Sequence, residues 1–508
     1  MNTLLQLLHE RPADTPAMVE SRRTLLVGDV LETSARMAAG LRALGVRKGD
    51  IAVVAAAPDA NFVCLTYAAM RCGLQLAILD PEMGRDNYRE KLRQLNAQWA
   101  FVDYRLLLLQ EHPIIRFLYF WWSKKGIYFP YSPQLRTIAT GNWLPIVQKH
   151  TPFRKILEAE TGLNEEAGLS DTDEFLITYT SGSTALPKGV VHQVGALGVS
   201  VRQIADLLGQ GKNRALATHL PQFALIGLNA GVTVHLWGQH LSPEAKIQFI
   251  EQHQITTLFG PPSDYLPLII RAEQRNEVLP ACLQHCFMGS APVYRSFLER
   301  FIRVLAPHVQ LTCLYGMTEN LVVATIDGRE KATLPTDAGD ILGQPVPGVE
   351  LQIAPDGEIL LRSPQTYARY LHLSARDAWH ASGDLGFLDA KGRIVLTGRK
   401  KDMIIRRNFN LYPGLYEPTI NRIPGVVESA FVGVFDEQKH DEVVGLFVET
   451  HTQLAPAAFR KQLENGDFSI DGEALPDMIF FETLPRGGRQ QKVDKNALRQ
   501  RLQEHLNR

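Results

Sequence analysis

Apolar runs and helical patterns alternate along the first 400 residues of the chain. Residues 34–45 have a helical pattern that Gly45 ends. Residues 51–57 form an apolar run typical of a buried strand, a helical stretch follows at 61–72, and Leu76–Leu79 is a second short apolar run. Strand, helix and strand at this spacing predict a parallel sheet with right-handed crossovers, which binds ligands at the carboxyl ends of its strands.

The pattern changes near residue 402. Residues 429–435 and 443–449 are apolar and strand-like, and a polar stretch at 455–465 is compatible with a helix. About 100 residues suffice for a small α+β domain. The charged stretch 398–402 lies between two apolar strand candidates, 394–396 and 403–405. Spacing alone leaves open whether this stretch is a linker between two domains or a hairpin turn within one.

Composition is typical of a folded protein of two or more domains. The chain has 508 residues, 45% hydrophobic and 21% charged, with a net charge of −1. This charge gives no global field that attracts nucleic acid, so we expect no nucleic-acid partner. Five cysteines do not make a disulfide framework and favour a reducing, cytoplasmic location. Cys282 and Cys286 lack the second ligand pair of a zinc site, which favours simple packing.

No stretch resembles a signal peptide or has the roughly 20 apolar residues of a spanning helix. The nearest candidate, residues 105–122, is interrupted by Glu111, Pro113 and Arg116. Its aromatic end is followed by two lysines, a combination that can dock at a membrane surface. We favour a helix packed on the domain core, with membrane contact at most peripheral.

A loop suited to phosphate binding follows residues 175–179, which read as a buried strand. The loop, TSGSTALPKG at 180–189, is crowded with hydroxyls and small residues and contains one lysine. Small residues let backbone N–H groups approach an anion, and the side chains add further donors. The candidates for triphosphate binding are Thr180, Ser181, Gly182, Ser183, Thr184 and Lys188. The loop lacks the Gly-Lys-Ser/Thr ending of a Walker A motif, and a plain surface turn is the alternative.

This loop closely resembles the phosphate loop of the ANL superfamily of adenylate-forming enzymes, which includes acyl-CoA synthetases and adenylation domains. Five further segments match in the family's order, so the resemblance covers nearly the whole chain. The first is Gly289-Ser290-Ala291-Pro292, which resembles the segment beside the adenine and the acyl pocket. The second is Tyr315-Gly316-Met317-Thr318-Glu319. The resemblance implies that Tyr315 stacks on adenine, Thr318 contacts the α-phosphate region and Glu319 binds Mg²⁺, with Thr184 as a second metal ligand. A hard carboxylate oxygen suits Mg²⁺.

The remaining three segments lie in the last third of the chain. In Ser382-Gly383-Asp384-Leu385-Gly386, the resemblance assigns Asp384 to the ribose hydroxyls. In Gly398-Arg399-Lys400-Lys401-Asp402, it gives Arg399 a ribose and phosphate contact and makes Lys401 the hinge, while Lys400 reads as a surface charge. Near the C-terminus, Lys492 matches the lysine that reaches into the active site for adenylation. A flexible basic tail is the alternative there.

The resemblance implies an α/β fold with a large N-terminal adenylation domain (1–399), whose parallel and mixed sheets are covered by helices. A small mobile α+β C-terminal domain (400–508) would carry the catalytic lysine. The implied reaction uses ATP and Mg²⁺ to convert a carboxylic acid to acyl-AMP with release of pyrophosphate. Coenzyme A or a carrier-protein thiol would then take the acyl group.

Four departures from the family pattern bear on the thiol step. Ala185 and Gln491 stand where glycine is usual, Ala224 stands where many acyl-CoA synthetases have histidine, and Asn408 replaces a glycine near the thiol tunnel. The strings at 221–225 and 416–421 resemble β-lactone synthetases, which need no coenzyme A. The hinge looks more like that of ordinary synthetases.

Three readings therefore stand: an acyl-CoA synthetase, a β-lactone synthetase or stand-alone acyl-AMP ligase, and a nucleotide-binding pseudoenzyme. The absence of an acidic residue in 219–227 favours a fatty or other apolar acid, with Phe223 and Ala224 in its pocket.

Overall fold

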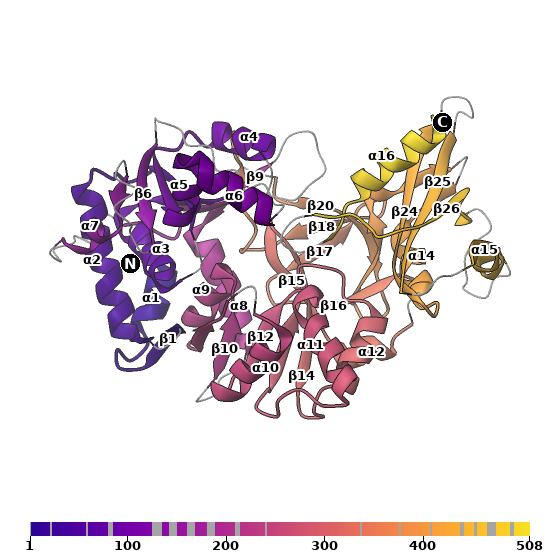
Figure 1. Cartoon of the computed structure of the whole chain (residues 1–508), viewed down its shortest axis with the longest axis horizontal. Coiled ribbons are helices and arrows are strands. Elements are labelled where there is room, and N and C mark those ends of the chain that lie inside the picture. The colour runs from indigo at the N-terminus through magenta and orange to yellow at the C-terminus, as the bar shows by residue number, and fades with distance from the viewer. Residues whose placement is uncertain are drawn as a thin grey trace. The chain divides into compact units, whose positions relative to one another are not determined.

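The computed structural model divides into two compact units (Figure 1). Unit 1 comprises Met1–Phe259, Met317–Leu321 and Pro364–Asp377, and unit 2 comprises Gly260–Gly316, Val322–Ser363 and Ala378–Arg508. The structure describes residues 2–20, 23–56, 59–79, 85–123, 135–141, 150–159, 168–179, 188–208, 214–238, 241–335, 338–374, 377–406, 409–436, 441–451, 455–464, 474–487 and 492–507.

Unit 1 contains an eight-stranded sheet in the order β19-β9-β8-β4-β3-β5-β6-β7. These strands are β3 (Ile51–Ala55), β4 (Gln75–Ile78), β5 (Trp99–Asp103), β6 (Arg136–Thr140), β7 (Thr151–Pro152), β8 (Glu174–Tyr179), β9 (Gly189–Gln193) and β19 (Arg369–Tyr370). The strands from β8 to β7 pair in parallel, and β9 and β19 add an antiparallel edge. The sheet is therefore mixed, as predicted.

The predicted strand–helix–strand unit is confirmed. Strand β3 leads into helix α3 (Ala60–Cys72), and β4 pairs with β3 in parallel. Gly73 follows α3 with a φ of 82°, the left-handed conformation that glycine adopts without a steric penalty. Helix α2 (Val27–Ala43) starts earlier than the sequence pattern suggested, and Gly45 lies just beyond its end with a φ of 95°.

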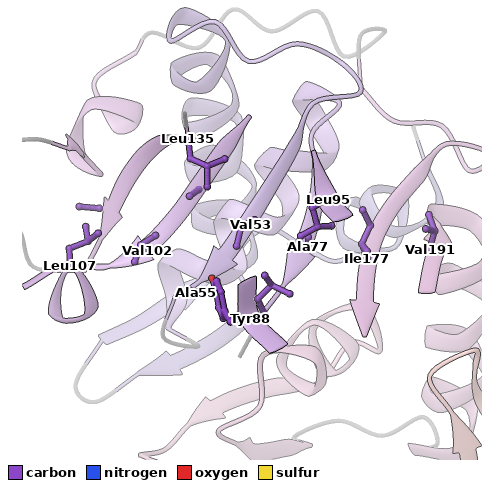
Figure 2. Close-up of a cluster of buried hydrophobic side chains, with 13 residues drawn as sticks. Val53, Ala55, Ala77, Tyr88, Leu95, Val102, Leu107, Leu135, Ile177 and Val191 are labelled. Atoms are coloured by element: carbon purple, nitrogen blue, oxygen red, sulfur yellow. The ribbon is translucent and has the colours of Figure 1, made fainter. Parts of the chain in front are cut away.

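One hydrophobic core of unit 1 lies against this sheet (Figure 2). Side chains from several parallel strands, such as Val53, Ala77 and Ile177, contribute to it together with Tyr88 and Leu95 of α4 (Arg85–Leu95). All five residues of β5 are buried. Burial of both faces explains why these strands read as continuous apolar runs rather than alternating ones.

A second group of strands in unit 1 has the order β12-β10-β11-β1-β2. The strands are β1 (Pro16–Glu20), β2 (Arg23–Leu26), β10 (Ala215–Thr218), β11 (Thr233–Leu236) and β12 (Thr257–Gly260). The other helices of unit 1 outside 104–123 are α1 (Thr3–His9), α7 (Arg154–Leu157), α8 (Val194–Leu208), α9 (Pro221–Asn229) and α10 (Pro243–Gln252).

The segment 105–122 forms two helices, α5 (Tyr104–Glu111) and α6 (Pro113–Ser123). Leu107 of α5 is buried in the core, in line with the favoured interpretation of a packed helix. For residues 113–118 of α6 that interpretation is wrong, because Ile114 is 76% and Phe117 is 68% exposed. Among the described residues, none of the helices combines the length and the apolarity that crossing a bilayer requires.

Unit 2 contains strands in the order β17-β18-β20-β21-β16-β15-β14-β13. They are β13 (His285–Met288), β14 (Gln310–Met317), β15 (Asn320–Asp327), β16 (Asp340–Pro345), β17 (Glu350–Ile353), β18 (Glu358–Arg362), β20 (His380–Leu388) and β21 (Ile394–Arg399). Helices α11 (Pro262–Arg275), α12 (Arg295–Arg303) and α13 (Gly328–Thr333) belong to the same unit. Cys286 is fully buried in β13, as the packing interpretation expects.

The C-terminal part of unit 2 is built on a three-stranded sheet, β24-β25-β26. The strands are β24 (Val426–Asp436), β25 (Asp441–Thr450) and β26 (Met478–Phe481), which confirms both predicted strands. Smaller elements are β22 (Ile404–Arg406), β23 (Phe409–Leu411), β27 (Arg486–Gly487), β28 (Lys492–Val493) and the helices α14 (Pro413–Ile420), α15 (Pro456–Glu464) and α16 (Lys495–Leu506). Residues of β24 alternate between two cores: Phe431 packs in one with α14, and Val432 packs in the other with α16.

Candidate active site

In unit 1, the predicted metal ligand Glu319 lies in a turn that a neighbouring segment holds in place. Thr318 and Glu319 form the turn between β14 and β15. The Tyr370 hydroxyl donates to Glu319 Oε1 at 2.9 Å, and the Tyr367 amide donates to the Glu319 carbonyl at 2.8 Å. Among the described residues, the Glu319 carboxylate accepts this one side-chain hydrogen bond, which leaves its remaining lone pairs available to a ligand.

Lys188, the lysine of the predicted phosphate loop, lies beside the same tyrosine. Its Nζ atom is 5.2 Å from the centre of the Tyr370 ring, and the residue is exposed. Burial, and then the charge of Glu319, raise the pKa of Tyr370. The phenol therefore keeps its proton and acts as the donor to Glu319. A cationic amine and a hard carboxylate thus flank one neutral tyrosine.

Hydrogen bonds from buried polar side chains hold the backbone around Thr318 in place. His192 on β9 hydrogen-bonds to the backbone of Thr318, and burial lowers the pKa of His192 to about 4, so that its ring is neutral near pH 7. Asn320 is fully buried and donates to Thr366 Oγ1 at 3.3 Å. These contacts position the backbone that carries the Thr318 and Glu319 side chains.

In unit 2, the second group centres on Asp384, a carboxylate that is only 3% exposed. The Tyr315 hydroxyl donates to Asp384 Oδ2 at 2.7 Å, and Arg399 Nε lies 2.9 Å from Oδ1. Asp384 and Arg399 are direct partners in the β20–β21 pairing, so the sheet register itself brings them together. Coulombic attraction to Asp384 raises the pKa of Arg399, and burial raises that of Tyr315.

Lys492 lies close to this ion pair. It is half-buried on β28, which pairs with β27 in the antiparallel direction. Burial, and then the positive charge of Arg399, lower the pKa of Lys492 to about 8. The charge of Asp384 acts in the opposite direction. Lys492 is therefore held in a folded environment with nearby charges, unlike a residue of a solvated basic tail.

The segment 289–291 follows β13 and lies close to the backbone of β14. A Cβ atom on Gly289 would lie 3.2 Å from the Cβ and carbonyl oxygen of Leu314, so a glycine lets this turn approach β14 closely. Ser290 is exposed and has a φ of 66°, in the left-handed region that costs a side chain about 1–2 kcal/mol. Ala291 is half-buried, and Gly316 lies near the end of β14. Strain at a surface turn is typical of functional segments.

The predicted hinge residue Lys401 lies in a short 3-10 turn, Lys400–Asp402, between β21 and β22. Burial lowers the pKa of Lys401. Lys400 instead pairs with Asp356 at 2.7 Å and Glu358 at 2.8 Å, which agrees with its interpretation as a surface charge. Asp402 binds Arg499 of α16 at 2.9 Å, so the turn is tied to the C-terminal helix.

The predicted acyl-pocket residues Phe223 and Ala224 are both buried in α9. The Phe223 ring packs against Phe259 with a centroid distance of 4.0 Å. Several other predicted residues lie outside the described residues: Thr180, Ser181, Gly182, Ser183 and Thr184, together with the departures Ala185, Asn408 and Gln491.

Comparison with known proteins determines the family. Residues 6–371 match the AMP-binding enzyme family. The chain belongs to this family. It is an enzyme of the AMP-forming acid ligase type, related to acyl-CoA synthetases, and the resemblance to the ANL superfamily is confirmed.

Two curated relatives are about one third identical to this chain. Indoleacetate–CoA ligase of Aromatoleum aromaticum is 32% identical over 64% of this chain and 66% of its own length. A CoA ligase of Mycobacterium tuberculosis, specific by name for a methyl-dioxo-octahydroindenyl propanoate, is 33% identical over 66% and 68%. The chain thus aligns with about two thirds of each relative.

A solved structure confirms the fold over nearly the full length. O-succinylbenzoate coenzyme A synthetase of Bacillus subtilis, in complex with ATP and magnesium ion, superposes with a TM-score of 0.78. The match covers 98% of this chain and 99% of the synthetase at 21% identity.

Sequence reasoning missed Tyr370 and His192, which hold the Thr318–Glu319 turn. Neither belongs to a motif. Only their position could have indicated them. His192 lies on β9, which begins at the end of the phosphate loop, and Tyr370 lies on β19, the strand that pairs with β9.

Proposed function

We propose that this enzyme uses ATP and Mg²⁺ to convert a carboxylic acid to its acyl-adenylate. The observation that carries the proposal is the group of Tyr315, Asp384, Arg399 and Lys492, in which a buried carboxylate, a paired guanidinium and a half-buried lysine lie close together. In such a group the carboxylate can accept hydrogen bonds from hydroxyls, and the guanidinium and the lysine can stabilise negative charge that develops during the reaction.

The residues around Asp384 fit a nucleoside. A carboxylate has about four lone-pair positions, and Tyr315 and Arg399 use two of them, which leaves acceptors for ribose hydroxyls. Tyr315 offers an aromatic face to adenine. In the proposal, Gly289, Ser290, Ala291 and Gly316 line the adenine side, and Arg399 also contacts the ribose and phosphates.

The residues around Glu319 fit a metal-bound triphosphate. Glu319 supplies a hard oxygen for Mg²⁺, and the exposed amine of Lys188 supplies a cation for phosphate oxygens. Thr184 would add a second oxygen ligand, and Thr180, Ser181, Gly182 and Ser183 would cradle the leaving pyrophosphate. Mg²⁺, when bound, would neutralise charge on the phosphates.

In the proposed reaction, the carboxylate of the acid attacks the α-phosphorus of ATP in line with the leaving pyrophosphate. A carboxylate is already ionised near pH 7 and needs no general base. The protein therefore has to position two anions and offset their repulsion. Lys492 would bridge carboxylate and phosphate oxygens, and Thr318 would contact the α-phosphate.

For the second step we propose transfer to coenzyme A, because the relatives are named CoA ligases. A carrier-protein thiol is an alternative acceptor. In this scheme, residues 400–508 form a mobile domain that turns about Lys401, so that one lysine serves adenylation and then withdraws. The alternative is a ligase without a CoA step, which closes a β-lactone or releases acyl-AMP. Ala224 and Asn408 support this alternative, because they depart from the pattern of acyl-CoA synthetases.

For the substrate we propose an apolar carboxylic acid. The relatives' names carry ring-bearing acids, namely indoleacetate, a fused-ring propanoate and succinylbenzoate, and give no support to a fatty acid. Buried Phe223 and Ala224 would form part of an apolar wall.

Product analysis by mass spectrometry tests this proposal. Purified enzyme is incubated with ATP, Mg²⁺ and a panel of aryl, cyclic, fatty and β-hydroxy acids, with and without coenzyme A. We expect pyrophosphate with any accepted acid, and AMP together with acyl-CoA when coenzyme A is present. A lactone or free acyl-AMP as the end product in the presence of coenzyme A would overturn the CoA step, and the absence of AMP, acyl-AMP and pyrophosphate with every acid would overturn the function.

A further inference from the structure

We propose that helix α6 docks the enzyme on the surface of a lipid bilayer with anionic headgroups. This inference does not depend on the acid or on the thiol. It starts from exposure: Ile114 is 76%, Phe117 is 68%, Leu118 is 56% and Ile115 is 41% exposed. These four lie within five residues, whereas the other large exposed hydrophobic side chains of the described residues are scattered singly or in one adjacent pair.

The four side chains gather on one side of the helix. At about 100° per residue, they fall within an arc of about 160°, and Arg116 lies opposite its centre. All six residues from Pro113 to Leu118 are exposed, which is more than one full turn. Within the described residues, α6 packs on α5, whose Leu107 enters the core. The apolar arc of α6 therefore faces water in the free protein.

The length of α6 limits what this arc can do. Eleven residues span about 16 Å, roughly half of the 30 Å hydrocarbon core of a bilayer. An apolar helix of this length is usually either buried in a protein core or placed at a membrane interface. The exposed fractions exclude the first role for its N-terminal half. The remaining role is an interfacial helix that lies in the headgroup region.

Charge complementarity identifies an anionic lipid surface as the occupant. The chain contains no Asp or Glu between Glu111 and Glu158, although its overall charge is −1. Arg116 is exposed on α6, and Lys124 and Lys125 follow its last residue directly in the sequence. Glu111 at the preceding end is paired with His150 at 2.9 Å. Lysines are depleted from protein–protein interface cores but attract anionic lipid headgroups.

Aromatic composition points the same way. The sequence of α6 ends in Tyr119-Phe120-Trp121-Trp122-Ser123, and the two lysines follow. Tryptophan and tyrosine concentrate at membrane interfaces, because their rings are apolar and their polar atoms reach water. Docking would place the enzyme where apolar acids partition.

Vesicle flotation of the full chain tests the proposal. The probes are vesicles of phosphatidylcholine alone and of phosphatidylcholine with phosphatidylglycerol, each at low and high salt. We expect the wild type to float with the anionic vesicles and to be released by salt. Phe117→Glu/Leu118→Glu should lower this binding about tenfold or more, because two apolar contacts are lost and two negative charges are added. Failure of the wild type to bind anionic vesicles would overturn the proposal.

A matched variant separates docking from general surface effects. Val278→Glu/Phe435→Glu alters side chains of similar exposure, 64% and 55%, outside the segment. It should bind vesicles like the wild type, and both variants should retain adenylation in solution. Equal vesicle binding by wild type and Phe117→Glu/Leu118→Glu would contradict the proposal. So would a wild-type dimer on gel filtration that becomes a monomer in this variant, because a second copy would then cover the arc.

Discussion

The group around Glu319 in unit 1 and the group around Asp384 in unit 2 are built differently. Glu319 is half-buried and accepts one hydrogen bond, from Tyr370, among the described residues. Asp384 is buried, and each of its oxygens already faces a donor, Tyr315 on one side and Arg399 on the other. The first carboxylate is held by one hydrogen bond and suits a hard cation, whereas the second is fixed by one partner on each of its oxygens.

This difference indicates which parts of the proposed site need a ligand to be organised. The pairing of Asp384 with Arg399 is set by the β20–β21 register. Glu319 and Lys188 are two opposite charges on either side of a neutral phenol, and bound metal and phosphate would complete their environment. We therefore expect substitutions in the second group to affect chemistry, and substitutions in the first to affect metal binding.

The largest expected effect is that of Lys492→Ala. Removing a cation aimed at developing charge should lower the adenylation rate about 100- to 1,000-fold. Nucleotide binding, measured by calorimetry, should survive because the Tyr315–Asp384–Arg399 network remains. Lys400→Ala is the matched control, since Lys400 pairs with Asp356 and Glu358, and it should keep near-normal rates. Equal adenylation by Lys492→Ala and the wild type would remove Lys492 from the proposed chemistry.

A smaller effect should appear in the pH profile. A lysine with a pKa of about 8 is mostly protonated at pH 7 and mostly neutral at pH 9. Because the proposed role needs the charged form, kcat/KM for adenylation should fall about tenfold between these pH values. In Lys492→Arg the residual activity should not show this fall, because arginine stays protonated. An unchanged slope in that variant would assign the titration to another group.

The smallest effect should come from Tyr370→Phe. Loss of one hydrogen bond to the Glu319 carboxylate should raise the Mg²⁺ concentration for half-maximal rate about three- to tenfold. Binding of Mn²⁺ in the presence of ATP, measured by electron paramagnetic resonance, should weaken in parallel. Tyr67→Phe removes a 2.7 Å bond to Asn229 and should leave the metal dependence unaltered. Identical metal dependence in Tyr370→Phe and the wild type would show that the hydroxyl does not position Glu319.

The sequence predicted local elements well because their signals are local. Gly45 and Gly73 mark helix ends, and apolar runs mark β3, β4, β24 and β25. Motifs indicated Asp384, Arg399 and Lys492 as candidate site residues, and their roles stay predictions. Their mutual geometry was not predictable, because Tyr315 and Asp384 are 69 residues apart and meet only in the folded sheet. Tyr370 and His192 were missed for the same reason.

Helix α6 shows a different limit of sequence reasoning. An apolar stretch of this length has the same pattern whether a core or a membrane surface covers it. Only the exposed fractions of Ile114 and Phe117 distinguish the two. The boundary at 399/400 stays a prediction.

The central claim, adenylation, is tested most directly by acid-dependent exchange of labelled pyrophosphate into ATP without coenzyme A. Reversible formation of acyl-AMP requires this exchange. We predict that at least one apolar acid supports it with the wild type and Mg²⁺, and that Lys492→Ala lowers it by the factor expected for adenylation. AMP formation without any pyrophosphate exchange, or exchange that does not depend on the acid, would contradict the proposed acyl-adenylate chemistry.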